Sequence, residues 1–378
     1  MSVCIEGPIS ATYYMTNPHT KDQRQHFFVF GDEHTPFSEN QCKTKPVIDI
    51  NEFISKLFQL VPPDSCIDVF IEEHSEEYAY LSEGVEEQES SPYWLFASKE
   101  DRRHEDNTLF DVQNLVFPLT HQCRIHWSDI RHLSQEEDDD LSLPISIYRA
   151  LLDITRPILI RIFWNRLKNP ITVPTYHALL DMLLGLKPLD PDMLGDLHVS
   201  MEEMHRLLRS APFNIPLVHT ITAWHSALSK RLEKCTLTKD QKEAFVAVCH
   251  HILDHEGVEP PDNQFAHESL TAYRYLDNLV TLLLDMYTFL RLFTRFRDDH
   301  ATETTPSRNT CRSAPQPKVS IIYIGDLHAE HLGQMFKACF RTPEEMLVVP
   351  GTSTPDVKAV DFFTPTYLLE RSIEVTGE

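Results

Sequence analysis

Two short segments far apart in the chain place an imidazole two residues after a carboxylate. They are Gly31-Asp32-Glu33-His34 and Gly325-Asp326-Leu327-His328, and each directly follows an apolar run. A carboxylate and an imidazole in one loop can act as a general acid and base, or as two ligands of a metal ion. The alternative is that each Asp only caps a helix N-terminus. We interpret the two segments as one site, with the candidate residues Asp32, His34, Asp326 and His328.

A third copy of the motif provides a comparison within the same chain. Gly195-Asp196-Leu197-His198 has the same residue types, but the residues before it (189–194) do not form an apolar strand pattern. We interpret this copy as a chance match or a helix-capping turn, because only the other two copies follow a predicted strand.

Further carboxylates follow other apolar runs. Glu72 and Glu73 come directly after residues 67–71, and Glu72 is the first choice because it is nearest the end of the run. The alternative is a solvated acidic turn. Asp129 and Arg131 follow residues 123–127 and could equally be a surface ion pair.

Asp285 lies among Leu282, Leu283, Leu284 and Met286 in a helical pattern. A carboxylate in so apolar a helix costs free energy unless it is paired or bound, so Asp285 is a secondary candidate. The favoured alternative is an outward-facing Asp on an amphipathic helix. Other histidines of the helical segments are interpreted as packed or solvated: His177, His205, His219, His225, His250, His251 and His255.

The spacing of apolar residues predicts the elements that position these side chains. Residues 26–30 and 67–71 are predicted strands, with a helix over 47–60 between them, which is a βαβ pattern with parallel strands. Strands are also predicted at 123–127 and 319–324. Because open α/β sheets place ligands at the carboxyl ends of their strands, the candidate residues are expected to converge there.

The rest of the chain suggests a large helical insertion. Residues 1–140 would form the first part of an α/β core with a mostly parallel sheet, and 145–297 an all-helical insertion or cap that includes a helix at 200–210. Residues 298–317 would be a flexible linker, and 318–345 the second part of the core, with a helix from residue 331 to 340. The extension 346–378 is expected to pack as extended chain.

Composition restricts the class of protein. The net charge is −23 over 378 residues, and no basic patch is apparent, so nucleic-acid binding is disfavoured. No signal peptide and no apolar stretch long enough to cross a membrane are visible, which favours a soluble intracellular protein. The eight cysteines show no regular spacing, which favours reduced, packed thiols over a disulfide framework.

The order of these features resembles the Tiki/TraB/erythromycin-esterase/ChaN-like superfamily. Both have a G-x-x-H motif after an N-terminal strand, an acidic residue closing the next strand, a helical middle and a second G-x-x-H near the C-terminus. The resemblance implies a site built from His34, Glu72 and His328, with Asp32 as the acidic residue of esterase-like members. A second glutamate cannot be placed in the helical segments, and the chain lacks the export signal of Tiki-type members.

The resemblance and the residues together lead us to expect hydrolysis of an ester or amide bond in a small molecule or peptide. A divalent metal ion (Mn, Co or Zn) held by His34, His328 and Glu72 could activate water, or a His/Glu pair could act as the general base. One alternative is a non-catalytic binding or structural protein with a degenerate site. A metallophosphoesterase is a weaker alternative, because the G-D-x-x-D and G-N-H-E segments do not follow His34 or His328.

Overall fold

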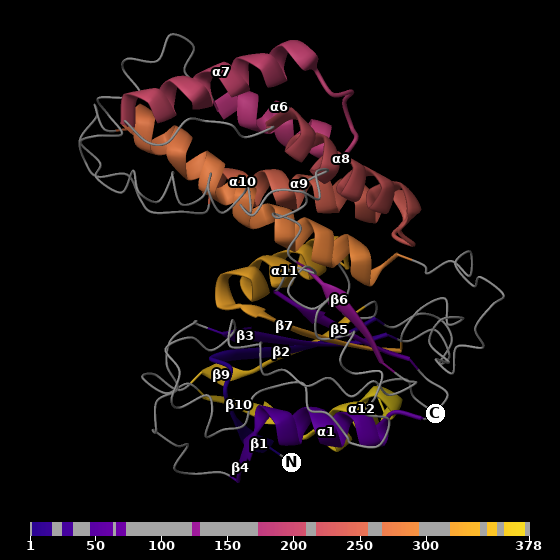
Figure 1. Cartoon of the computed structure of the whole chain (residues 1–378). Coiled ribbons are helices and arrows are strands. Elements are labelled where there is room, and N and C mark those ends of the chain that lie inside the picture. The colour runs from indigo at the N-terminus through magenta and orange to yellow at the C-terminus, as the bar shows by residue number, and fades with distance from the viewer. Residues whose placement is uncertain are drawn as a thin grey trace, which may run out of the picture. The chain divides into compact units, whose positions relative to one another are not determined.

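Apolar runs that end in a glycine or an acidic residue form adjacent strands of one sheet. In the computed structural model these strands are β3 (His26–Asp32), β5 (Ile67–Ile71), β6 (Cys123–Trp127) and β7 (Val319–Gly325). They pair in parallel, with β5 between β6 and β7, and β7 between β5 and β3. The last of these strands along the chain therefore lies between two strands from the N-terminal part (Figure 1).

The structure describes residues 2–16, 25–32, 46–62, 66–72, 123–128, 173–208, 217–255, 267–294, 318–340, 346–353 and 359–374. The chain divides into two units. We call Met1–Ser128 with Arg295–Glu378 the α/β unit, and Asp129–Thr294 the helical unit. The predicted linker at 298–317 and residues 145–172, the start of the predicted helical insertion, lie outside the described residues.

The main sheet of the α/β unit is mixed. Its order is β6-β5-β7-β3-β2-β8, where β2 (Ser10–Thr16) is antiparallel to β3 and β8 (Met346–Pro350) is antiparallel to β2. The combination of helices and sheets agrees with an α/β protein. The expectation of a mostly parallel sheet is not confirmed, because the two strands at one edge run antiparallel to their neighbours.

A smaller sheet of the α/β unit brings the two ends of the chain together. Its order is β4 (Val47–Asp49), β1 (Ser2–Glu6), β10 (Ala359–Phe363) and β9 (Thr352–Ser353), with β1 and β10 antiparallel. The predicted helix at 47–60 therefore begins three residues late, as α1 (Ile50–Leu60) after a short strand. The C-terminal extension forms strands and a helix, α12 (Pro365–Glu374), so the expectation of extended chain holds only in part.

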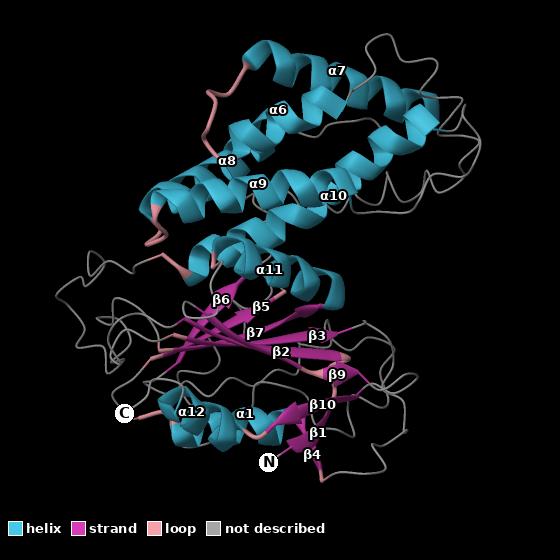
Figure 2. Ribbon diagram, turned by 180° about the vertical axis from the view of Figure 1, so that it is seen from behind, coloured by secondary structure: helices cyan, strands magenta, loops and turns pink. Residues whose placement is uncertain are grey.

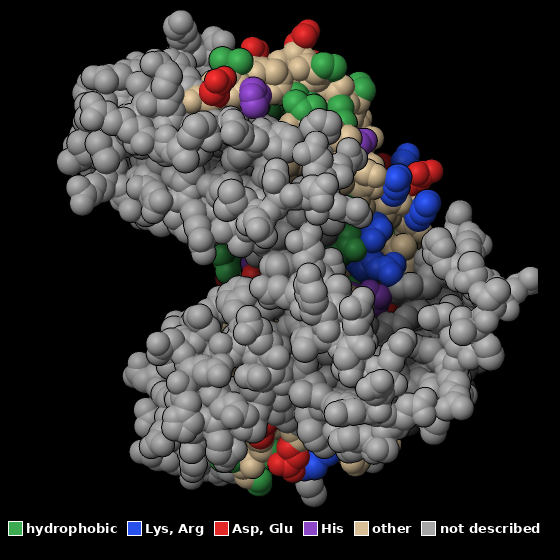
Figure 3. Space-filling model, viewed as in Figure 1, with side chains coloured by type: hydrophobic (Ala, Val, Ile, Leu, Met, Phe, Trp, Pro, Cys, Tyr) green, Lys and Arg blue, Asp and Glu red, His purple; other side chains and the backbone are tan. Residues whose placement is uncertain are grey.

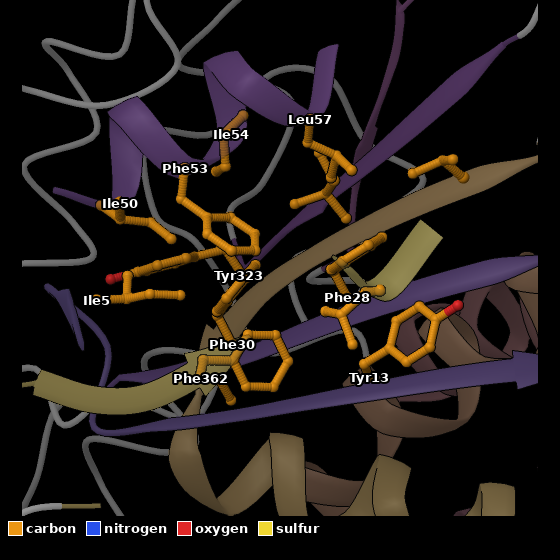
Figure 4. Close-up of a cluster of buried hydrophobic side chains, with 14 of the residues drawn as sticks. Ile5, Tyr13, Phe28, Phe30, Ile50, Phe53, Ile54, Leu57, Tyr323 and Phe362 are labelled. Carbon is orange, nitrogen blue, oxygen red and sulfur yellow. The ribbon is translucent and has the colours of Figure 1, made fainter. Parts of the chain in front are cut away.

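One face of the main sheet packs against α1 and the smaller sheet. Alternate residues of each strand point to the same face, and the side chains on this face include Tyr13, Phe28 and Tyr323. Phe30 contacts Phe53 of α1 edge to face, with ring centroids 5.6 Å apart (Figure 4). Burying each of these aromatic side chains contributes about 1.5–3 kcal/mol.

The other face of the main sheet is covered by α11 (Asp326–Cys339) (Figure 2). Phe336 of α11 stacks on Tyr14 of β2 with centroids 4.4 Å apart, and it contacts Phe27 of β3 at 5.1 Å. Burial raises the pKa of Tyr14 to about 12, although a side-chain hydrogen bond with Thr12 opposes this shift. α11 is therefore fixed on the sheet by aromatic packing several residues from its N-terminus.

The helical unit contains α6 (Val173–Leu183), α7 (Pro191–Leu208), α8 (Leu217–Lys234), α9 (Lys239–His255) and α10 (His267–Leu292). The side chains of Phe245 in α9 and Phe289 in α10 stack with centroids 5.3 Å apart. The third motif copy, residues 195–198, lies within α7, so this helix begins earlier than the predicted 200–210. None of the described helices is long and apolar enough to cross a bilayer.

Basic side chains gather over the end of α8 (blue in Figure 3). Arg231 in the last turn of this helix donates a hydrogen bond from Nη2 to the hydroxyl of Tyr287 in α10, at 2.8 Å. Its guanidinium also lies over the Tyr287 ring, 4.5 Å from the centroid, which is a cation–π contact. Part of this positive charge therefore joins α8 to α10.

The cysteines correct one expectation from the sequence. Cys4 and Cys66 are disulfide-bonded, so the interpretation of the cysteines as reduced thiols is wrong at these two positions. Cys235, Cys249 and Cys339 are free and buried, as expected for packed thiols. Irregular spacing was a poor guide because a disulfide depends on distance in the folded chain.

Candidate functional site

The strand register brings the ends of β3, β5 and β7 to one edge of the main sheet. Asp32, the last residue of β3, pairs with Gly325, the last residue of β7. Ile71 of β5 pairs with Tyr323 of β7, so Glu72 directly follows the strand on the other side. Three carboxyl ends therefore lie side by side, with Asp32, Glu72 and Asp326 at or just after them.

Glu72 lies next to His328 at this edge. Glu72 Oε1 is 3.2 Å from His328 Nε2, and the two side chains are only 4% and 7% exposed. These residues are more than 250 positions apart in the sequence, and the parallel pairing of β5 with β7 brings them together. A carboxylate at this distance can orient the imidazole.

The second carboxylate oxygen of Glu72 has a structural partner. The backbone N–H of Gly325 donates a hydrogen bond to Glu72 Oε2 at 2.6 Å. Gly325 is the N-cap of α11, and this helix has no side-chain cap of its own. Glu72 therefore accepts a hydrogen bond at a helix N-terminus, where a negative charge is stabilised by the helix dipole.

Asp32 and Asp326 have partners of different kinds. The hydroxyl of Tyr323 donates to Asp32 Oδ2 at 3.2 Å, and Asp32 is only 1% exposed. The hydroxyl of Ser10 donates to Asp326 Oδ1. The alternative that Asp326 caps its helix does not describe this side chain, because α11 has no side-chain cap hydrogen bond.

Gly31 allows Asp326 to lie close to the backbone of β3. A Cβ at residue 31 would lie 2.9 Å from the Cα of Asp326 and 2.5 Å from its Oδ1. Gly31 is not among the glycines with positive φ, and Gly325 has a φ of −58°, which any residue can adopt.

His331 is a site residue that the sequence interpretation missed. It lies three residues after His328 in α11, is 1% exposed, and has a ligand atom within 4.8 Å of one of His328. Residues three apart lie on the same side of a helix, so both imidazoles are on one face of α11. The signal was present as His-Ala-Glu-His, but nothing in the sequence shows that His331 is buried.

A second pair of a carboxylate and an imidazole joins β6 to β5, the strand that Glu72 directly follows. Asp68 Oδ2 in β5 is 3.2 Å from His126 Nε2 in β6, and both side chains are buried. The ring of His126 stacks on Phe70, with centroids 4.5 Å apart. Asp68 and Glu72 are four residues apart and so belong to the same side of the strand, away from the α1 face. Neither Asp68 nor His126 was a candidate from the sequence.

The remaining predicted site residues are His34, Glu73, Asp129, Arg131 and Asp285. His34, Glu73, Asp129 and Arg131 lie outside the described residues. Asp285 is a residue of α10 in the helical unit and is fully buried, so the expectation that it faces outward is wrong. The described site therefore consists of Glu72 and His328, with Asp32, Asp326 and His331.

Comparison with protein-family models, curated proteins and solved structures finds no match to this chain.

The geometry allows two kinds of chemistry. An imidazole held by a carboxylate can take a proton from water or a substrate hydroxyl, because the carboxylate stabilises the imidazolium that forms. Two imidazoles and a carboxylate can instead bind a divalent metal ion, a set of donors typical of zinc and neighbouring transition metals.

Proposed function

We propose that this protein is a hydrolase of ester or amide bonds, with its site at the carboxyl edge of the main sheet. The observation that supports this most is the buried pair of Glu72 and His328, 3.2 Å apart. Burying a carboxylate and an imidazole costs free energy, and open α/β sheets place their ligands at the carboxyl ends of the strands, where this pair lies. The substrate would be a small molecule or a peptide.

In the general-base form of this proposal, Glu72 holds His328 through Nε2 while His328 Nδ1 takes a proton from water. The oxygen of that water attacks the carbonyl carbon of the substrate. The imidazolium then returns the proton to the leaving alcohol or amine as the bond to it breaks. Glu72 stabilises the intermediate imidazolium and stays ionised throughout.

In the metal form, His328 and His331 would hold a divalent ion such as Mn, Co or Zn, with Glu72 as a further ligand or as the partner that orients His328. His34 remains a proposed ligand from the sequence. The bound ion would lower the pKa of a water molecule, which supplies the nucleophile. The fit is supported by the ligand atoms of His328 and His331, which lie within 4.8 Å of each other.

Membership of the Tiki/TraB/erythromycin-esterase/ChaN-like superfamily remains part of the proposal. It is supported by the contact between Glu72 and the histidine of the second G-x-x-H motif. A metallophosphoesterase is not favoured by any contact in the described residues.

A non-catalytic protein on the same fold is the second candidate function, and one observation favours it. Each carboxylate at the edge has a partner that could be purely structural: Gly325 for Glu72, Tyr323 for Asp32 and Ser10 for Asp326. In that case the site would only connect α11 to the strand ends.

A hydrolysis screen with generic esters and peptides separates the two candidates. Wild type and His328→Gln would be compared, with metal content measured in the same preparations. The hydrolase proposal expects activity in wild type and a loss of about 100-fold or more in His328→Gln. His198→Gln in the third motif copy is the matched control and should keep full activity. A wild type inactive on the whole panel, or a His328→Gln variant as active as wild type, would favour the non-catalytic protein.

A further inference from the structure

A second group of histidines lies in the helical unit, on other elements than the proposed hydrolase residues. His177 of α6 and His250 of α9 have their Nδ1 atoms 2.8 Å apart. Their ring planes differ by only 12°, with centroids 4.9 Å apart. The sequence interpretation gave both residues no role, because a histidine in a helix is most often packed or solvated.

Each of these imidazoles forms a hydrogen bond with a carboxylate through its other ring nitrogen, Nε2. His177 Nε2 donates to Asp254 Oδ1 at 2.7 Å, and His250 Nε2 donates to Asp181 Oδ1 at 2.8 Å. The other oxygen of Asp181 is 2.6 Å from Lys187 Nζ. A hydrogen bond from Nε2–H to a carboxylate fixes that tautomer, which leaves the lone pair of a neutral ring on Nδ1.

Two neutral rings in this arrangement would direct two lone pairs at each other across 2.8 Å. That contact is repulsive unless an electrophile lies between the nitrogen atoms. A single proton can occupy the gap as an N–H···N hydrogen bond. A metal ion can instead accept both lone pairs if the two rings move apart and tilt towards it. Imidazoles oriented by carboxylates are the usual form of histidine ligands in metal sites.

The charge and exposure of the group also suit a cation. Among the described residues, two carboxylates contact the pair and one lysine contacts Asp181, so these three side chains together carry a net negative charge. The side chains of His177, His250, Asp181 and Asp254 are between 18% and 34% exposed. Water can therefore reach the site and complete the coordination of an ion, as in sites with an open position.

We propose that His177 and His250 form a binding site for a borderline divalent transition-metal ion such as Zn²⁺ or Cu²⁺, with Asp254 and Asp181 orienting the two ligands. Imidazole ligands select this class of ion over Mg²⁺ and Ca²⁺, which prefer oxygen. Bonds of about 2.0–2.1 Å at a tetrahedral angle require nitrogen atoms roughly 3.3 Å apart. On binding, the two nitrogen atoms would therefore separate by about half an ångström and the rings would tilt so that both lone pairs point to the ion.

Zinc titration of the full-length protein tests the proposal. After metal removal with a chelator, the number of Zn²⁺ equivalents and their affinity would be measured by competition with a chromogenic chelator. His177→Gln and His250→Gln should each lose one equivalent relative to wild type. Asp254→Asn should keep that equivalent with an affinity about 10–100-fold weaker, because it removes only the partner that orients His177.

His251→Gln is the matched control, because it changes the next residue of α9. The His251 ring contacts His255 with centroids 4.2 Å apart, so this variant also tests whether that pair binds the ion instead. His251→Gln should bind as wild type does. Loss of the equivalent in His251→Gln, or unchanged binding in His177→Gln and Asp254→Asn, would overturn the proposal.

A wild type that binds no Zn²⁺ would also overturn the proposal. The contact between the two Nδ1 atoms would then be explained by a shared proton. Circular dichroism identifies variants that do not fold. Should His177→Gln and His250→Gln fail to fold, Asp254→Asn decides, because it keeps both imidazoles and its affinity shift is measured on folded protein. His328→Gln should retain this equivalent, so the outcome is separate from that of the proposed hydrolase.

Discussion

At the scale of single residues, Glu72 has two partners that serve different purposes. One oxygen accepts the N–H of Gly325 at the start of α11, and the other lies 3.2 Å from His328. The first contact supports the fold and the second supports the proposed chemistry. Two substitutions of the same residue can therefore separate the two roles.

Glu72→Gln should leave the fold intact, while Glu72→Ala should destabilise the α/β unit by about 1–3 kcal/mol. Glutamine keeps an oxygen acceptor for Gly325, whereas alanine leaves a buried N–H and a buried imidazole without their partner. Chemical denaturation of both variants measures the difference. Equal stability of the two variants would show that the contact with Gly325 does not contribute to the fold.

Gly31→Ala should destabilise the protein by about 1–3 kcal/mol, because the added Cβ would overlap backbone and side-chain atoms of Asp326. Gly195→Ala is the matched control from the third motif copy, where a Cβ has no neighbour within 4 Å. In a helix interior this change should be neutral or stabilising by up to about 1 kcal/mol. Thermal melting of both variants checks the contrast, and equal melting temperatures would contradict it.

Only part of the site could be predicted from individual residues. Glu72 was singled out because it follows a buried strand, and the structure places it beside His328. His331, Asp68 and His126 gave no such signal, because burial and partners across strands depend on register. The buried position of Asp285 was missed because an amphipathic pattern cannot tell which face a single Asp occupies.

At the scale of elements, α11 positions His328 and His331, and it rests on the sheet through Tyr14 and Phe336. Burial raises the pKa of the Tyr14 hydroxyl to about 12. Between about pH 10 and pH 12 the hydroxyl therefore stays protonated in the folded protein but is ionised in the unfolded chain. The stabilisation is complete below pH 10 and is lost as the pH rises from about 10 to 12.

Wild type should therefore lose roughly 1–2 kcal/mol more stability than Tyr14→Phe between pH 9 and pH 11, because phenylalanine cannot ionise. Urea denaturation of both proteins at pH 9 and pH 11 gives the change in the free energy of unfolding of each, and the two changes are compared. The result would be contradicted by an alkaline loss of stability that is the same in the variant and in wild type.

Most strands at the core of the sheet could be predicted, since apolar runs ending in Gly or an acidic residue coincide with β3, β5, β6 and β7. β2 and β4 were missed for separate reasons. β2 contains threonine, serine and tyrosine, and β4 is three residues long and continues into a helical pattern. α7 begins before its predicted range, because Gly195 weakened the helical signal there.

At the scale of the whole molecule, the antiparallel edge of the main sheet could not be predicted. β2 and β8 come from opposite ends of the chain, and no turn or crossover signal connects them. Local patterns describe a strand and its next neighbour, but pairing across more than 300 residues is decided by which edges remain free after the core has formed.

The cysteines allow a test of the chain as a whole. Alkylation of the unfolded protein without a reductant should modify Cys235, Cys249 and Cys339 but leave Cys4 and Cys66 unmodified, because the first three are thiols and the other two are disulfide-bonded. Peptide mass spectrometry identifies the labelled sites. Labelling of Cys4 or Cys66 without a reductant would contradict the disulfide state.

The account depends most on Glu72 and His328 acting as one unit, and a double-mutant cycle tests this directly. The measurement is kcat/KM for the best ester of the screen in wild type, Glu72→Gln, His328→Gln and the double variant. Because Glu72 acts through His328, each single change should cost about 100-fold or more, and the double variant should be no slower than His328→Gln. Effects that multiply in the double variant, or a Glu72→Gln variant as active as wild type, would contradict the claim.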